Sequence, residues 1–142
     1  MKTKNKKALF NYKLEPDRVE AGIVLTGGEA KAVRLGKTDL SNAHARIVEG
    51  EVYLVNANIP IEGKKSYNST RSRKLLLHKK EIVSLESKVK QRKLTLVPVS
   101  VYTKHRLVKV ELALGKSKRK FEKRQTIKKR DIDRDIEREL KN

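Results

Sequence analysis

An enzyme needs acid, base or nucleophile side chains that converge, and the histidines of this sequence do not suggest such a site. His44, His78 and His105 lie far apart in the chain, and none belongs to a metal-ligand or catalytic-triad pattern. The chain has no cysteine, which excludes disulfides, zinc ribbons and thiol chemistry. The glycines of LTGGEAK (residues 25–31) match neither a phosphate-binding loop nor a dinucleotide-binding fingerprint. The sequence therefore predicts a protein that is not an enzyme and that carries no metal and no cofactor.

The chemistry that the sequence favours is the binding of a polyanion. Its 36 lysines and arginines outnumber its 17 aspartates and glutamates, so the formal net charge is +19 and the isoelectric point is near 10.2. A chain this basic attracts nucleic acid, an anionic membrane or an acidic protein. The distribution of apolar residues helps to separate these partners.

Membrane binding is disfavoured by the shortage of large apolar side chains. The chain has no tryptophan and two phenylalanines, both beside charged runs, which do not anchor a basic amphipathic helix in a bilayer. No segment approaches the roughly 18 consecutive apolar residues of a transmembrane helix, and residues 1–10 lack the apolar run of a targeting segment. We therefore expect a cytoplasmic protein whose partner is nucleic acid.

The strongest basic cluster in the presumed folded region surrounds the segment KLLLH. Its members are Arg71, Arg73, Lys74, Lys79 and Lys80. A solvated loop would also explain these residues, but so much like charge repels itself unless a partner neutralises it. Four tyrosines could stack on bases, although each is equally suited to packing: Tyr12, Tyr53, Tyr67 and Tyr102.

The clearest local signal is a strand followed by a helix. The run VEAGIVL (residues 19–25) is short and apolar and lies between Pro16 and a glycine pair, which is typical of a buried strand. Thr26 and Glu29 then have the spacing of a capping box, so a helix is predicted to begin after Thr26 and to end at Gly36.

The middle of the chain predicts a hairpin and then a loop. The segment ARIVEGEVYLVNANI (residues 45–59) reads as two strands around Glu49 and Gly50. Residues 60–74 contain glycine, proline, serine, asparagine and five basic side chains but no periodic apolar pattern. We expect a long exposed loop there, and long loops often carry function.

The second half predicts a helix and another hairpin. In KKEIVSLESKVKQR (residues 79–92), Ile82, Leu85 and Val89 share one helical face and are expected to cover the core. The segments LTLVPVSVY and RLVKVELAL both show strand periodicity, and the polar residues 103–105 separate them. We therefore expect these two strands to pair.

These elements predict a mainly β domain with some helix. Five or six short strands, with two helices among them and no strand–helix alternation, favour a small antiparallel OB-like β-barrel with two or three helices over a doubly wound sheet. Residues 1–7 are expected to form a mobile basic arm, with ordered structure beginning near Ala8. Residues 8–115 would form the barrel and residues 116–142 a basic C-terminal tail, in a protein expected to be a monomer.

The tail differs from the barrel in composition. Residues 116–130 contain nine basic residues and one acidic residue, a net charge of +8, and their only large apolar side chains are Phe121 and Ile127. So little apolar surface does not offset a backbone ordering cost of about 1–2 kcal/mol per residue, so this segment is expected to be disordered alone and to order on a polyanion. Residues 131–142 predict a helix that forms only when docked.

Seven stretches, in order along nearly the whole chain, match the motifs of one known family. They are NKKA (5–8), EAGIVLTGGE (20–29), KxxR (31–34), RKLLLHKKE (73–81), LTLVP (94–98), KVEL (109–112) and EKRQTIKKRD (122–131). In these stretches the sequence resembles the SsrA-binding proteins, also called small protein B. The resemblance implies a bacterial, non-enzymatic partner of transfer-messenger RNA in trans-translation, the rescue of ribosomes stalled on messages without a stop codon. It also implies an OB-like barrel that binds the tRNA-like domain of this RNA, and a tail that enters the empty messenger channel and folds there as a helix.

The resemblance assigns site residues by position. The RNA-contacting positions in the first part of the chain are Asn5, Lys6, Lys7, Glu29, Lys31 and Arg34. Those in the later strands are Leu76, His78 and Lys109, and the basic cluster adds Arg71, Arg73 and Lys74. The tail positions at the decoding centre of the ribosome are Phe121, Lys123, Arg124, Ile127, Lys128 and Arg130. The chain departs from the family pattern at Gly28 and at Ser117.

Glu29 has two interpretations at this point. A helix cap worth about 1 kcal/mol is a sufficient physical account of it. The resemblance favours a dual role, in which its carboxylate also accepts a hydrogen bond from a base edge or a sugar hydroxyl while lysines hold the phosphates. The alternative function, a generic ribosome-associated or single-stranded RNA-binding OB protein, predicts stacking on several exposed aromatic rings, but only 4% of the residues are aromatic.

Overall fold

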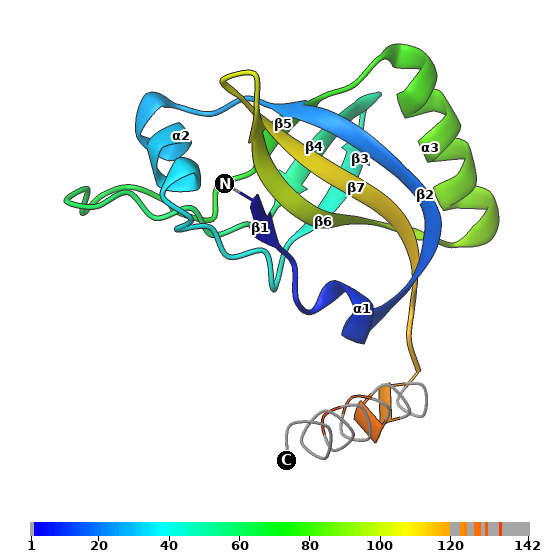
Figure 1. Ribbon diagram of the computed structural model, residues 1–142. Helices are drawn as coiled ribbons and strands as arrows, with labels where there is room; N and C mark the ends of the chain where they lie inside the picture. Colours follow the sequence, from blue (N-terminus) through cyan, green and yellow to red (C-terminus); the bar gives the residue numbers. More distant parts are fainter. Residues whose placement is uncertain (1, 120–122, 125–126, 129, 131–133, 135–142) are drawn as a thin grey trace.

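The structure is a computed structural model that describes residues 2–119 and, in the tail, residues 123, 124, 127, 128, 130 and 134. The described residues form seven strands and three helices (Figure 1). The strands are β1 (Lys2–Lys4), β2 (Tyr12–Ile23), β3 (His44–Val48), β4 (Glu51–Val55), β5 (Arg73–Leu76), β6 (Thr95–Lys104) and β7 (Leu107–Ser117). The helices are α1 (Ala8–Asn11), α2 (Gly27–Arg34) and α3 (Lys79–Arg92).

The strand pairings are antiparallel and join the strands into a ring. The order in the sheet is β1-β6-β3-β4-β5-β2-β7, and β7 also pairs with β6. The strands from β2 to β7 therefore close on themselves, with Ala45 of β3 and Leu96 of β6 as the single pair that joins those two strands. The predicted antiparallel, mainly β fold with helices is confirmed. The strands are longer than predicted, because β2, β6 and β7 have 12, 10 and 11 residues.

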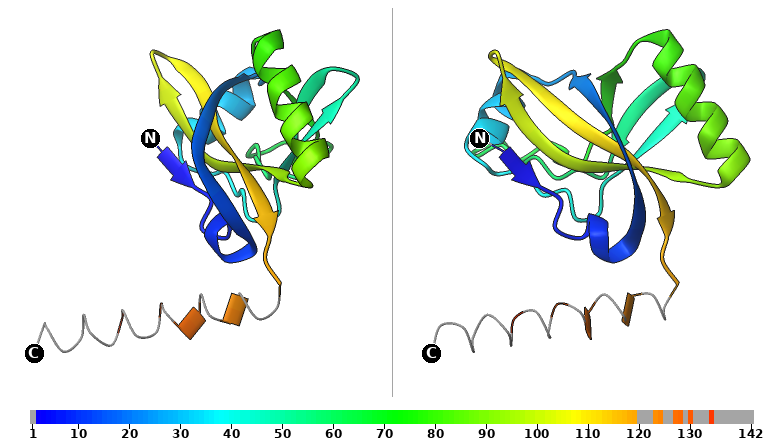
Figure 2. Two further views of the ribbon diagram at one scale, coloured as in Figure 1. Left: turned by 90° about the vertical axis from the view of Figure 1, so that its right-hand side faces the viewer. Right: turned by 45° about the vertical axis from the view of Figure 1, so that its right-hand side comes forward.

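The core lies inside this ring. Alternation along β4 points Val52 and Leu54 inward, where both are buried. Helices α2 and α3 lie at opposite ends of the ring (Figure 2). The predicted helix over residues 79–92 is confirmed as α3, with Leu85 buried and Ile82 and Val89 packed half-buried against the core.

The N-terminal residues are paired, which corrects the expectation that ordered structure begins near Ala8. Lys2–Lys4 form β1, and Thr3 lies opposite Val101 of β6. Immediately afterwards, the backbone N–H of Asn5 donates to the carbonyl of Val99 at 2.8 Å. A strand of alternating lysines carries no apolar signal, and it forms here because β3 leaves this part of the β6 edge free to pair.

Strand β2 is longer than the predicted strand over residues 19–25, and Pro16 does not delimit it. The register between β2 and β7 shifts between Leu14 and Arg18, so Pro16 lies where the ladder is interrupted. A proline is tolerated at such an irregularity because it has no N–H to donate. One strand therefore runs from Tyr12 to Ile23, and residues 24–26 connect it to α2.

Both predicted hairpins are confirmed, and each has a two-residue turn in the left-handed region. Glu49 and Gly50 join β3 to β4 with φ values of 51° and 76°. His105 and Arg106 join β6 to β7 with φ values of 50° and 67°. A left-handed conformation costs about 1–2 kcal/mol for a residue other than glycine, so the second turn is the less favourable one.

Replacing His105 by Asn and Arg106 by Gly is expected to raise the free energy of unfolding by about 1 kcal/mol, because Asn-Gly is the preferred sequence for this kind of turn. Urea unfolding would measure the change. The control is Gly50→Ala in the other turn, where φ is +76° and open space surrounds the Cβ position, and it should lower the stability by about 1 kcal/mol. An unchanged or lower stability of the double variant would show that the turn is not strained.

Candidate nucleic-acid interface

Three neighbouring strands place predicted RNA-contacting residues side by side on the outer face of the ring. Gly22 of β2 lies opposite Leu76 of β5 on one side and opposite Lys109 of β7 on the other. Because side chains alternate along a strand, these positions point outward while Ala21 and Leu75 beside them are buried. The fold therefore brings Leu76 and Lys109 together although they are distant in the sequence.

These residues line a groove of about 560 Å³, called here the β2–β5–β7 groove. Its lining comprises Arg18, Val19, Glu20, Gly22, Leu76, Leu77, His78, Glu81 and Lys109. Gly22 keeps the middle of the groove open, since a Cβ at that position would stand 3.4 Å from the Cβ of Leu76. Leu76 itself is 53% exposed. The predicted residues Leu76, His78 and Lys109 therefore meet in one groove.

Glu20 is the more exposed of the two carboxylates that line the β2–β5–β7 groove. The hydroxyl of Tyr102 donates a hydrogen bond to its Oε2, and Lys104 Nζ lies 3.6 Å from the same atom. The hydrogen bond from Tyr102 lowers the pKa of Glu20 below its ordinary value. Desolvation opposes this shift, and the charges of Lys104 and Lys109 add to it. Among the described residues, none donates a hydrogen bond to Oε1 of Glu20. The ionised carboxylate therefore keeps one acceptor atom for a ligand.

The sequence did not single out Glu20, which occurs within the predicted strand VEAGIVL and the motif EAGIVLTGGE. Burial, together with Glu20 and Glu111, raises the pKa of Tyr102 to about 12, so the phenol stays a donor and orients the carboxylate. The signal that could have singled out Glu20 is an acidic residue in the outward register of an otherwise apolar strand of a basic chain. Recognising it requires the strand register, which the sequence does not supply.

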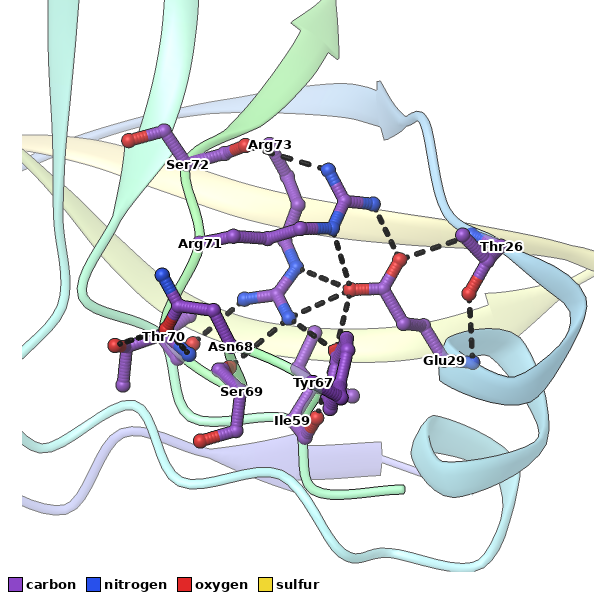
Figure 3. Close-up of polar contacts among 11 residues, drawn as sticks. Thr26, Glu29, Ile59, Tyr67, Asn68, Ser69, Thr70, Arg71, Ser72 and Arg73 are labelled. Carbon is purple, nitrogen blue, oxygen red and sulfur yellow. Dashed lines mark hydrogen bonds and ion pairs between the residues drawn. The ribbon is translucent and has the colours of Figure 1, made fainter. Parts of the chain in front are cut away.

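Glu29 lies at the centre of a buried network (Figure 3). The predicted capping box is confirmed, because the Thr26 N–H donates to Glu29 Oε1 at 2.9 Å and the Glu29 N–H donates to Thr26 Oγ1 at 3.3 Å. Three side chains from outside α2 also converge on Glu29 Oε2: Tyr67 Oη at 2.7 Å, Arg71 Nε at 3.0 Å and Arg73 Nε at 2.8 Å. Arg71 Nη2 contacts Oε1 as well. We call these five residues the Glu29 network.

Arg73 is the most deeply buried cation of the described residues, with 0% of its surface exposed. Its Nη1 donates to the carbonyl of Ala57 at 2.7 Å, and its Nη2 donates to the carbonyl of Ser69 at 2.9 Å and lies 2.6 Å from Glu29 Oε2. Each guanidinium nitrogen therefore has a partner, which is what allows a charged side chain to be buried.

This burial bears on two interpretations. The exposed loop predicted over residues 60–74 ends earlier, since Arg73 and Lys74 begin β5 and only Lys74 points outward. The Glu29 carboxylate is also 0% exposed, as is Arg73, so both charged groups make their contacts inside the protein in this structure, and the RNA contacts assigned to them stay predictions. An isolated sequence cannot show this, because Glu29 and Arg73 are far apart in the chain and each alone is typical of a surface residue.

The pKa of Glu29 reflects the same network. Burial by itself raises the pKa of this carboxyl, but hydrogen bonds from Arg71, the Thr26 backbone, Tyr67 and Arg73 outweigh burial. The pKa therefore lies well below its ordinary value, and Glu29 is ionised throughout the physiological range.

The other predicted cations of the folded region lie on different surfaces. Lys31 and Arg34 are exposed on α2, and Arg34 Nη2 donates to the carbonyl of Arg106 in the β6–β7 turn at 3.3 Å. Lys74 is exposed on β5 and its Nζ lies 3.1 Å from Glu51 Oε1. The predicted residues therefore do not all converge on one site.

The N-terminal predicted residues form a turn between β1 and α1. The side-chain amide of Asn5 donates to the carbonyl of Pro98 at 2.9 Å, and its oxygen accepts from the N–H of Lys7 at 3.2 Å. Asn5 thus fixes the turn, while Lys6 and Lys7 are exposed. These two lysines remain available to a polyanion.

The tail continues from β7 past α1 (Figure 1). Lys123, Arg124, Ile127, Lys128 and Arg130 are described and have helical backbone, whereas the predicted residue Phe121 lies outside the described residues. The cationic ends of two tail residues lie over the ring of Phe10 in α1, Lys123 at 5.8 Å and Arg130 at 5.7 Å from its centroid. Of the docked helix predicted over residues 131–142, only residue 134 is described.

Two kinds of feature are absent from the described residues. In this part of the chain, histidine and acidic side chains do not gather in groups of three or more that could hold a metal ion. None of the described helices has the length and apolar character needed to cross a membrane.

The groove combines an exposed apolar side chain, a cation and an ionised carboxylate, and it lies on a ring of antiparallel strands in a chain whose net charge is +19. These features are typical of a nucleic-acid-binding β protein. The model of the SmpB protein family matches residues 2–142, and the chain belongs to this family.

Relatives from several bacteria are similar over nearly the whole chain. An SsrA-binding protein of Dehalococcoides mccartyi is 48% identical over 142 residues, covering 98% of this chain and 82% of the relative. The SsrA-binding protein of Mycoplasma mycoides is 46% identical, covering 98% and 94%. A solved structure described as "tmRNA-SmpB: a journey to the center of the bacterial ribosome" is 41% identical, with a TM-score of 0.68, and covers 84% of this chain and 85% of the other.

Proposed function

We propose that this protein binds transfer-messenger RNA through the β2–β5–β7 groove and acts with that RNA on stalled ribosomes in trans-translation. The observation that carries the proposal is the convergence of Glu20, Leu76, His78 and Lys109 in one groove. Family membership supports the choice of RNA, since the relatives are SsrA-binding proteins and the similar solved structure concerns transfer-messenger RNA and the ribosome. The family is an RNA-binding family and not an enzymatic one, and it works in the cytoplasm.

The groove supplies three kinds of contact to an RNA. Lys109 and Arg18 neutralise phosphates, which gives affinity without sequence information. Leu76 packs against an unstacked base. The free Oε1 of Glu20 accepts a hydrogen bond from a base-edge donor or a 2′-hydroxyl, which a lysine or arginine cannot do. The discriminating role that sequence reasoning gave to Glu29 therefore belongs to Glu20.

The ring of strands is best interpreted as an OB-like barrel. Its support is the closed circuit of pairings from β2 to β7, with α3 placed between β5 and β6. The groove lies on the outer face of such a barrel, where folds of this kind bind oligonucleotides. We expect one copy of the chain to bind each RNA.

The tail is proposed to sense the empty messenger channel. Its residues Lys123, Arg124, Ile127, Lys128 and Arg130, with Phe121, would contact the decoding centre. The high positive charge of the segment and its shortage of apolar residues support an element that orders on ribosomal RNA.

Replacing Glu20 by Gln or Lys109 by Gln is expected to weaken the binding of transfer-messenger RNA about 10-fold or more, as expected for the loss of a charge-assisted hydrogen bond. Filter binding at about 0.15 M salt measures it. The control Lys88→Gln removes one exposed lysine of α3, away from the groove, and should change affinity by no more than about twofold. If only total charge mattered, Lys109→Gln and Lys88→Gln would weaken binding equally and Glu20→Gln, which removes a negative charge, would strengthen it, and this outcome would contradict the proposal.

A further inference from the structure

The segment between β4 and β5 is closed at its base by hydrogen bonds. The Ile59 N–H donates to the carbonyl of Ser69 at 2.9 Å, so residues 60–68 form a loop that projects from the ring. Arg73 holds both limbs of this base, because its two Nη atoms donate to the carbonyls of Ala57 and Ser69. The position of the projecting loop therefore depends on where Arg73 is held.

Glu29 holds Arg73 and thereby ties the loop to α2. Tyr67 strengthens the tie, since its Oη lies 2.7 Å from Glu29 Oε2, 2.7 Å from Arg73 Nη2 and 2.9 Å from the carbonyl of Ile59 (Figure 3). A capping box needs only the contacts between Thr26 and Glu29. The additional donors on Glu29 are Tyr67 in the loop, Arg71 after the loop and Arg73 in β5. The network therefore joins α2 to a segment that is distant from it in the sequence.

The loop lies along α2 (Figure 1). Ile61 packs against Gly28 so closely that a Cβ on Gly28 would stand 3.1 Å from Ile61 Cδ1. Farther along, Lys37 Nζ lies 3.5 Å from Glu62 Oε2. A cavity of about 130 Å³ has walls from both elements, with Lys31 on one side and Pro60 on the other.

The joined loop and helix present a strongly basic surface. Its charged residues are Lys31, Arg34, Lys37, Glu62, Lys64 and Lys65, and all six are exposed. Five cations and one carboxylate make a net charge of +4. Within the described part of the chain, Lys31, Lys64 and Lys65 make no ion pair. We call this the loop–helix surface.

The loop–helix surface is continuous with the β2–β5–β7 groove. Strand β2 leaves the groove and is joined to α2 by the short connection of residues 24–26, and Arg34 contacts the β6–β7 turn at Arg106. Lys104, at the base of that turn, pairs with Glu20 in the groove. A single folded RNA can therefore span both surfaces.

We propose that the Glu29 network positions Lys64 and Lys65 beside α2, so that the loop–helix surface binds backbone phosphates of the same RNA that occupies the groove. This inference rests on the proposed function, because it takes its RNA from there. In it, Lys64 and Lys65 are contact residues, while Glu29 and Tyr67 are positioning residues that touch no RNA.

The test is the dependence of RNA affinity on salt concentration, measured with transfer-messenger RNA. Each lost phosphate contact reduces the slope of log K against log[salt] by about 1, so the double variant Lys64→Gln/Lys65→Gln should reduce it by about 2. The control pair Lys88→Gln/Lys93→Gln removes the same charge from α3 and its C-cap residue, at the opposite end of the ring, and should leave the slope within about 0.5 of wild type. Equal slopes for the two double variants would overturn the contact.

The positioning role is tested with Tyr67→Phe, which removes only the bridging hydroxyl. If Tyr67 acts through the loop, this substitution should reduce affinity about 3-fold or more in the wild-type background and have no effect in the Lys64→Gln/Lys65→Gln background. An equal loss in both backgrounds would show a merely structural role and would overturn the inference. Should ordinary tRNA give the same affinities and the same slopes, the proposed function would fail while the loop–helix surface would stand as an RNA contact.

Discussion

Glu29→Ala is expected to lower the free energy of unfolding by about 3–5 kcal/mol, the cost of removing one partner from a buried ion pair. Arg73 is fully buried and its Nη2 lies 2.6 Å from Glu29 Oε2, so the substitution leaves a guanidinium charge inside the protein without its anion. A domain is stabilised by about 5–15 kcal/mol in total, so a large part of the stability would be lost. Urea unfolding monitored by circular dichroism measures it.

Two controls separate the network from simpler explanations. Thr26→Ala removes the side-chain cap of α2 and should cost about 1 kcal/mol. Glu86→Ala breaks the exposed pair with Lys90, in which the two side chains are 36% and 74% exposed, and should cost no more than about 0.5 kcal/mol. If Glu29→Ala cost no more than Thr26→Ala, the cap would be the whole structural role of Glu29.

The same network gives stability a dependence on pH. The pKa of Glu29 is lower in the folded protein than in the unfolded chain, where it is about 4.3, so the unfolded chain takes up a proton first. The contribution of Glu29 is therefore fully present above about pH 5 and is lost as the pH falls below about 4. In Glu29→Gln, this part of the acid-induced loss should be absent, so its stability should fall less steeply with pH than that of wild type.

Deleting residues 119–142 is expected to abolish ribosome rescue while leaving the binding of transfer-messenger RNA nearly intact. The deletion begins after Lys118 because β7 runs to Ser117, opposite Tyr12, and the Lys118 N–H donates to the carbonyl of Asn11 at 2.9 Å. The tail beyond this point has ten basic and six acidic residues, so the truncated protein keeps a net charge of +15. Tagging of stalled products in a purified translation system would measure rescue.

The groove variant Glu20→Gln provides the matched comparison for the deletion. It keeps the tail but should lose RNA affinity, so rescue should return when the RNA concentration is raised. Rescue by the truncated protein should not return at any RNA concentration, because its defect lies after RNA binding. Tagging by the truncated protein at the wild-type level would contradict the division of labour between ring and tail.

The parts of the fold that were predictable depend on short-range patterns. The capping box of Thr26 and Glu29 and the turn at Glu49 and Gly50 are specified by residues within a few positions of each other. The apolar face of α3 follows from the helical period in the same way. Local chemistry alone determines these features, so they can be predicted without the tertiary structure.

The parts that were not predictable depend on partners distant in the sequence. Strand β1 has no apolar pattern that would predict it. It forms because its backbone pairs with the free edge of β6. Arg73 looks like one more cation of an exposed cluster until the fold brings Glu29 and Tyr67 to it. Glu20 becomes a candidate only when the register of β2 shows that it shares an outward groove with Lys109. Long-range pairing, rather than residue type, decides these roles.

Competition between transfer-messenger RNA and ordinary tRNA would show whether the β2–β5–β7 groove selects its RNA. Labelled transfer-messenger RNA would be bound at about 0.15 M salt, and unlabelled tRNA added in excess, with wild type and with Glu20→Gln. Wild type is expected to retain its RNA, whereas Glu20→Gln is expected to release it to the competitor. Equal displacement from wild type, or selectivity that survives Glu20→Gln unchanged, would contradict selection by the groove.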